Sequence, residues 1–301
     1  MDASIKETIV CFGDNGGLTG IITRPANETL CKDFCIILLN PGIIHKIGVN
    51  GLNVKIARKA GCSGYTCFRF DFSGLGDSVS SRFVNDPDKQ KLMEVRLAMD
   101  IVQKKTGISK FILKGICSGS EIAFKYALAD NRVTGLILID GIYQDRTKIE
   151  PVLKDAYRSQ TLRYYKKNKF NFDKWLKLIT GKSELMRRIK MKDVFSLFTE
   201  KFRTVKSSNN ISSPERPDIT DSVNQWMRLL ENSTKILLIF CEGGLFIDVF
   251  NLTVARPLNS LPNKNQITFN YMKNVDHTFT PIWSQHKLIS TIMDWLDNVS
   301  L

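Results

Sequence analysis

Short apolar runs separated by amphipathic stretches are the feature that most limits what this 301-residue chain can fold into. The run 34–39 is apolar on both faces and ends in Asn40-Pro41-Gly42, which is typical of a central strand in a buried sheet. Similar runs follow at 65–70, 111–113, 133–140 and 236–241. Helical spacing of apolar residues lies between them, at 50–60, 91–104 and 121–128.

This alternation of strands and helices predicts an α/β fold, with a mostly parallel, doubly wound sheet and helices on both faces. A hairpin is expected in front of it, formed by 8–12 and 18–23 around a glycine-rich turn. In such a sheet the functional loops gather at the carboxyl ends of the strands.

One segment interrupts the alternation. Residues 143–228 contain no strand-like run and instead show helical patterns rich in basic and aromatic residues. The domain organisation predicted from this is a first part of the core over 1–142, a basic helical cap over 143–228, and a second part of the core over 229–301.

The positive charge is concentrated in that insertion. Residues 148–206 hold 17 Lys and Arg against six acids, so they carry +11 of the chain's formal +13. One interpretation is a solvated helical surface. The other is a docking face for an acidic partner, such as an acyl carrier protein or the phosphates of coenzyme A. Nucleic acid is not expected as a partner, because the sequence has no known binding motif.

Composition narrows the remaining classes. The chain is 43% hydrophobic, enough for a large core, and has no apolar run long enough to span a membrane. No leader pattern is visible at its start, and its seven cysteines are scattered, so we expect a soluble, cytoplasmic protein. No metal site is expected, since Cys31 and Cys35 have no second Cys/His pair at zinc spacing. No cofactor is expected either, because no helix opens directly after Gly74-x-Gly76.

The strongest local signal is Gly115-Ile116-Cys117-Ser118-Gly119, between a predicted strand and a predicted helix. A nucleophile at the centre of G-x-Nu-x-G sits on a sharp turn that exposes its side chain at a helix N-terminus. For Ser118 to be central, glycines would be needed at 116 and 120, where the sequence has isoleucine and serine. The register therefore selects Cys117.

A nucleophile of this kind needs a histidine late in the chain and an acid to orient it. His277 follows the strand-like stretch 267–271 and suits the role of base. Three acids are open as its partner: Asp248 first, Glu242 second, and Asp140, at the end of an earlier strand, third. The oxyanion hole is expected from the N–H groups of Ser118 and Ile43, with Gly42 permitting the turn. Arg69 and Asp71 are expected to pair with each other.

These segments, taken in order, resemble the α/β-hydrolase superfamily over residues 34–142 and 235–297. The resemblance implies the α/β-hydrolase fold with a helical cap insertion. Within the superfamily the chain looks most like bacterial hydrolases and acyltransferases encoded beside biosynthetic pathways. Its cysteine, where most members have serine, implies the thioester chemistry of thioesterases, dienelactone hydrolases and N-acyltransferases. Its Gly244 stands where most members place the acid.

The function expected from these residues is an acyl hydrolase of the thioesterase or esterase type, acting on a small acyl thioester or ester through an acyl-enzyme on Cys117. The alternative is an acyltransferase that passes the same acyl group to an amine or alcohol in a biosynthetic pathway. A third possibility is a binding protein that kept the fold, and the presence of both Cys117 and His277 at their stations argues against it. No motif encodes the acyl group, the acceptor or the oligomeric state.

Overall fold

The computed structural model describes residues 4–79, 86–167, 219–242, 244–261 and 263–299. They fall into two units, one formed by 1–146 with 219–301 and the other by 147–218. Of the second unit the described part is 147–167, which contains helix α4 (Glu150–Lys167). The rest of the predicted basic cap, 168–218, lies outside the described residues.

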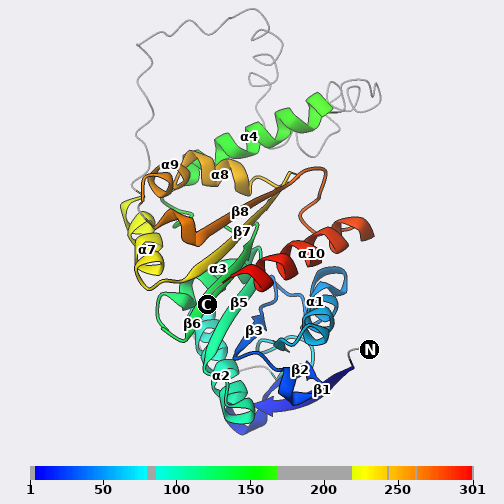
Figure 1. Cartoon of the computed structure of the whole chain (residues 1–301). Helices are drawn as coiled ribbons and strands as arrows, with labels where there is room; N and C mark the ends of the chain where they lie inside the picture. Colours follow the sequence, from blue (N-terminus) through cyan, green and yellow to red (C-terminus); the bar gives the residue numbers. More distant parts are fainter. Residues whose placement is uncertain (1–3, 80–85, 168–218, 243, 262, 300–301) are drawn as a thin grey trace, which may run out of the picture. The chain divides into compact units, whose positions relative to one another are not determined.

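The first unit is built on one eight-stranded sheet with strand order β1-β2-β4-β3-β5-β6-β7-β8 (Figure 1). Strands β1 and β2 form the predicted hairpin, β2 pairs antiparallel with β4, and all further pairs are parallel. The strand bounds are Ile5–Phe12, Leu18–Pro25, Phe34–Leu38, Thr66–Phe70, Lys110–Ile116, Val133–Ile139, Lys235–Cys241 and Ile267–Met272 for β1 to β8.

Helices cover both faces of this sheet, as the alternation predicted (Figure 1). The helices of the first unit are α1 (Leu52–Cys62), α2 (Pro87–Thr106), α3 (Ser118–Ala127), α7 (Thr220–Glu231), α8 (Phe246–Leu252), α9 (Ala255–Asn259) and α10 (Ile282–Asn298). Short 3-10 turns lie at Asp14–Gly16, Glu28–Leu30, Val49–Gly51 and Lys264–Gln266. One apolar cluster lies under α2, α3 and α7, and a second under α1 and α10.

Local chemistry explains why the elements begin and end where they do. In α2, Asp86 caps the first turn by accepting from two backbone N–H groups, and Pro87 follows at the first helical position. Gly107 ends the helix with a positive φ of 77°. All five residues of β3 are buried, as expected for a central strand that is covered on both faces. Together these features confirm the predicted fold class.

The insertion is narrower than the sequence suggested. Tyr143 and helix α7 both lie in the first unit, although the predicted cap covered 143–228. The reason is Trp226, which is fully buried and packs on Phe124 of α3 and on Tyr143, with ring centroids 4.8 and 5.4 Å away. An amphipathic helix without a strand pattern looks the same in a sequence whether it covers a sheet or belongs to an insertion.

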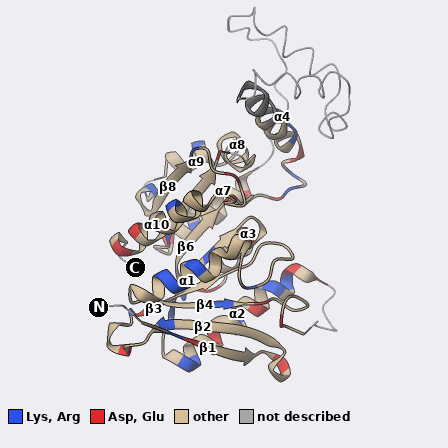
Figure 2. Cartoon of the chain, turned by 90° about the vertical axis from the view of Figure 1, so that its right-hand side faces the viewer, with Lys and Arg blue, Asp and Glu red and all other residues tan. Residues whose placement is uncertain are grey.

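Charges of both signs are mixed over the described helices and strands (Figure 2). Among these residues, no helix is long and apolar enough to cross a membrane.

Replacing Trp226 with alanine tests the assignment of α7 to the core. We expect Trp226→Ala to lower the free energy of unfolding by about 3–5 kcal/mol, because a fully buried aromatic side chain leaves a cavity. Urea unfolding of the two proteins measures the difference. The matched control is Trp283→Ala, since that side chain is half exposed, and its effect should stay within about 0.5 kcal/mol. Equal effects of the two variants would contradict the assignment.

Candidate active site

Cys117 stands in the turn between β5 and α3, with a backbone φ of 54° and ψ of −126°. A residue other than glycine rarely adopts a positive φ, so surrounding contacts must hold it there. The Cys117 N–H donates to the carbonyl of Ile139 at 2.9 Å, and the Cys117 carbonyl accepts from Ser120 N–H at 3.0 Å. The neighbouring strand β6 thus fixes the N–H of Cys117, and helix α3 fixes its carbonyl.

The two glycines of the elbow are required by space. A Cβ at Gly115 would lie 2.2 Å from the backbone of Gly119, and a Cβ at Gly119 would lie 3.0 Å from the carbonyl oxygen of Asn40. Helix α3 therefore passes directly over β5 and beside the end of β3. This close approach presents Cys117, which is partly exposed, at the carboxyl edge of the sheet.

His277 reaches the same edge from the loop after β8. Asp276 shapes this loop by accepting hydrogen bonds from the hydroxyl of Thr278 and from the backbone N–H of Thr280. Phe279, buried and with φ of 53°, anchors its far side. The imidazole then has two hydrogen-bond partners, Asp140 and the side chain of Cys117.

Among the described residues, the acid bonded to His277 is Asp140, the third of the three predicted candidates. Its Oδ2 lies 2.9 Å from His277 Nδ1, and its Oδ1 accepts the N–H of Cys241 at 2.9 Å. Asp140 is fully buried and follows β6 directly, with φ of 48°. Because Nδ1 is bonded to Asp140, Nε2 is left to face the Cys117 thiol.

The order of preference among the acids was therefore wrong. Glu242, the second candidate, accepts the backbone N–H of Asn274 at 2.6 Å and so supports the histidine loop. Asp248, the first candidate, lies in the first turn of α8. A Cβ placed on Gly244 would lie 3.6 Å from Asp140 Oδ2. The glycine thus stands beside the acid, and the tightest neighbour of such a Cβ is Phe246, whose Cδ2 would lie 2.8 Å away.

Charge at His277 follows from these contacts. Burial by itself lowers the pKa of His277, but the hydrogen bonds to Asp140 and Cys117 and their negative charges outweigh it and raise the pKa to about 9. The imidazole is then protonated at neutral pH. Phe246 stacks on it with a centroid separation of 4.8 Å and an interplanar angle of 25°, which suits a cationic ring.

The loop after β3 lies against the elbow. The N–H of Gly42, whose φ is 52°, donates to the hydroxyl of Ser118 at 2.8 Å. The amide of Gly42 is thereby engaged, and the next residue, Ile43, is 85% exposed. This arrangement places the predicted oxyanion residues Gly42, Ile43 and Ser118 on two adjoining segments.

An ion pair ties the same loop to the end of β4, and it differs from the one predicted. The buried carboxylate of Asp71 accepts both the N–H and the ammonium of Lys46, the latter at 2.7 Å. Arg69, expected to pair with Asp71, instead contacts Glu7 of β1 at 2.8 Å. Within a strand, side chains two residues apart lie on the same face, which is why residues 69 and 71 were expected to meet. Strand β4 ends at Phe70, however, so Asp71 does not follow this alternation.

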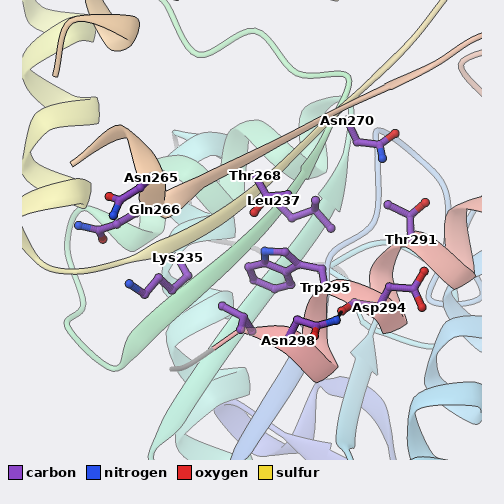
Figure 3. Close-up of a pocket in the computed structure, with 11 residues that line it drawn as sticks. Lys235, Leu237, Asn265, Gln266, Thr268, Asn270, Thr291, Asp294, Trp295 and Asn298 are labelled. Carbon is purple, nitrogen blue, oxygen red and sulfur yellow. Dashed lines mark hydrogen bonds between the residues drawn. The ribbon is translucent and has the colours of Figure 1, made fainter. Parts of the chain in front are cut away.

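A hollow of about 570 Å³ lies between β7, β8 and α10, bordered by Lys235, Leu237 and Trp295 (Figure 3). Lys235 and Leu237 stand at the start of β7, whereas Asp140 and His277 follow strand ends. The hollow therefore lies towards the opposite end of the strands from Asp140 and His277.

The imidazole of His277 should titrate with a midpoint near pH 9, because its two acidic partners stabilise the protonated ring. Nitrogen-15 NMR of the imidazoles measures this directly, since the chain has three histidines and His277→Gln identifies the resonance. A midpoint below pH 7 would rule out a protonated His277 paired with Asp140 at neutral pH.

The same shift sets the sign of a stability effect. Below the unfolded pKa, near 6.5, His277 is protonated in both states and its contribution is fully present; it is lost as the pH rises through the folded pKa, about 9. The difference in unfolding free energy between the natural protein and His277→Gln should therefore shrink by about 1–3 kcal/mol from pH 6 to pH 9.5. A difference that stays constant over this range would contradict the assignment.

Comparison with known proteins agrees with the fold. A family model described as the alpha/beta hydrolase fold matches residues 36–187. Among solved structures, a serine hydrolase without a lid from Xanthomonas campestris is 13% identical, with a TM-score of 0.54, over 99% of this chain and 97% of its own. An esterase from Pyrococcus furiosus is 13% identical, with a TM-score of 0.55 and coverage of 98% and 91%. A proline iminopeptidase from Mycobacterium smegmatis is 16% identical, with a TM-score of 0.55 and coverage of 97% and 98%.

No curated protein matches. With the family model covering half of the sequence, the chain belongs to the α/β hydrolase fold family.

Proposed function

We propose that the protein is an acyl hydrolase of the thioesterase or esterase type, in which Cys117 forms a thioester with the acyl group, His277 moves the proton and Asp140 orients His277. The observation that carries the proposal is the continuous chain of contacts from a buried carboxylate through a protonated imidazole to a cysteine held at a strained turn. Nucleophile, base and orienting acid in this order are the parts that nucleophilic acyl transfer requires.

The charged imidazole defines how the first half of the reaction proceeds. The Cys117 thiolate attacks the carbonyl carbon, a carbon–sulfur bond forms, and the carbonyl oxygen takes up the negative charge. As the tetrahedral intermediate collapses, the bond to the leaving group breaks and His277 Nε2–H protonates that group. The acyl group then remains on Cys117 as a thioester, with His277 neutral.

The second half returns the enzyme to its starting state. Neutral His277 takes a proton from water, and the resulting hydroxide attacks the thioester. The carbon–sulfur bond breaks, the carboxylic acid leaves, and the thiolate–imidazolium pair is restored. In both halves the negative oxygen is stabilised by the N–H of Ser118, at the start of α3, and by the N–H of Ile43.

An acyltransferase is the second candidate, and the observation that favours it is the cysteine itself. A thioester is attacked by amines more readily than the oxygen ester that a serine would form. The same acyl-enzyme then passes its acyl group to an amine or alcohol instead of water.

The basic insertion suggests how the acyl group is delivered. Its +11 charge suits an acidic acyl carrier protein or the phosphates of coenzyme A. The proposal is that one of these carries the acyl donor.

Cys117 should gain the mass of the acyl group when the protein is incubated with an acyl thioester such as butyryl-N-acetylcysteamine. Intact-mass spectrometry detects the adduct, and Cys117→Ala should lack it and lose about 10³-fold or more in turnover. Cys62→Ala, which removes an exposed thiol elsewhere, is the matched control and should be acylated normally. Turnover of Cys117→Ala at the natural rate would refute the mechanism.

The fate of the acyl group separates the two candidates. The loaded enzyme is placed in water alone or with a primary amine at increasing concentration. A hydrolase releases mainly the free acid in both cases, whereas an acyltransferase releases mainly the amide and holds its acyl group in water alone.

Asp140→Asn should lower kcat by about 10²–10⁴-fold, because the amide neither stabilises the imidazolium nor selects its tautomer. Asp248→Asn is the control and should stay within about threefold of the natural enzyme. Normal activity of Asp140→Asn together with loss in Asp248→Asn would restore the order of preference drawn from the sequence.

A further inference from the structure

Lys114 is a charged side chain in the middle of the buried sheet, three residues before Cys117. It is 1% exposed, and its register partners on the neighbouring strands are Leu38 of β3 and Ile137 of β6, both fully buried. The side chains that face it from β3, β6 and α1 are apolar or amides. The catalytic steps described above do not use Lys114.

A chain of hydrogen bonds leads from this lysine to the loop beside the nucleophile. Lys114 Nζ donates to Asn53 Oδ1 of α1 at 2.9 Å, and Asn53 Nδ2 donates to Asn40 Oδ1 at 3.0 Å. Asn40 Nδ2 donates in turn to the carbonyl of Phe70 at 2.7 Å. Both asparagines are 1% exposed, so every member of the chain depends on its neighbours for hydrogen bonds.

The two ends of this chain fix its direction. The ammonium form of Lys114 has only donors, and the Phe70 carbonyl only accepts. Each asparagine amide must therefore turn its oxygen towards Lys114 and its nitrogen towards Phe70. Without the lysine, the buried oxygen of Asn53 loses its donor, while the Phe70 carbonyl still holds Asn40, so the loss falls on Asn53.

The chain also holds both ends of the segment 40–48, which we call the oxyanion loop. Asn40 is its first residue, and the N–H of Asn53 donates to the carbonyl of Ile47 near its end, at 3.1 Å. A Cβ on Gly48 would lie 2.7 Å from Asn53 Cγ, so the loop rests directly on this side chain. Between these two points lie Gly42, which contacts the elbow, and Ile43.

We propose that Lys114 is a positioning residue that sets the oxyanion loop through Asn53 and Asn40, so that the Ile43 N–H meets the oxygen of the reacting acyl group. The inference rests on the proposed function. Stability alone does not account for a lysine here, since a buried cationic group without a charged partner costs free energy that an apolar side chain of similar size avoids. Burial indeed lowers the pKa of Lys114 to about 7.

Two reactions of the same thiol separate positioning from general damage. Acylation of Cys117 by p-nitrophenyl acetate develops an oxyanion, whereas alkylation by iodoacetamide does not and needs only the thiolate. In Lys114→Met we expect kcat/KM for acylation to fall about 10–100-fold, part of the effect of removing one oxyanion donor. The alkylation rate should stay within twofold, and the melting temperature at pH 6 should equal or exceed that of the natural protein.

Two further variants complete the test. Asn53→Leu breaks the chain at its centre and should show the same division between acylation and alkylation, so it carries the test if Lys114→Met does not fold. Ile112→Ala, on the same strand and face and equally buried, is the control: it should lower the melting temperature and leave acylation within threefold.

The proposal is overturned if acylation in Lys114→Met and Asn53→Leu stays within twofold, or if acylation and alkylation fall together in both. These outcomes differ from a failure of the proposed function. In that case the natural protein itself forms no acyl-enzyme on Cys117, whatever residue stands at 114.

Discussion

The contact between Gly115 and Gly119 is the constraint on which the site depends. A single methyl group at either position would push α3 away from β5 or from the end of β3. With both glycines in place, a single residue, Cys117, separates the end of the strand from the start of the helix, and that residue is forced to a positive φ. The strain at Cys117 is thus the consequence of packing that a large apolar sheet stabilises elsewhere.

The other catalytic candidates are brought to this turn by the parallel arrangement of the strands. Asp140 follows β6 and His277 follows β8, and their side chains meet although 137 residues separate them in the chain. The backbone of β7 lies between, and it contributes through the Cys241 N–H, which holds the second oxygen of Asp140. An acid that follows β6 therefore reaches the histidine across one strand, with Gly244 beside it.

Sequence reasoning was sufficient for features with a strong local pattern. Buried strands show as apolar runs, and the elbow shows as two glycines in fixed register around Cys117. The acid was misjudged because Asp140, Glu242 and Asp248 all follow apolar runs or open a helix, and nothing in a sequence shows which strand end faces the histidine. The width of the insertion was misjudged for a similar reason, since the burial of Trp226 depends on Phe124 and Tyr143, which are distant along the chain. Lys114 did carry a signal: it is a charged residue between Leu113 and Gly115, in the interior of a strand whose other residues after its first, Lys110, are apolar.

Burial acts on His277 and Lys114 in the same direction, yet their charges differ in the folded protein. For both groups removal from water lowers the pKa. His277 Nδ1 is hydrogen-bonded to Asp140, and the imidazole also has the side chain of Cys117 as a partner; these two groups more than reverse the effect. Lys114 has one neutral amide and no charged partner, so the effect of burial stands. The protein therefore keeps a cation beside Cys117, and three residues before that cysteine it holds a lysine that donates a hydrogen bond and whose pKa is lowered. The pKa values differ because the two groups have different partners. The loop after β6 supplies the carboxylate of Asp140 to His277, whereas the interior of the sheet offers Lys114 only apolar side chains and the amide of Asn53.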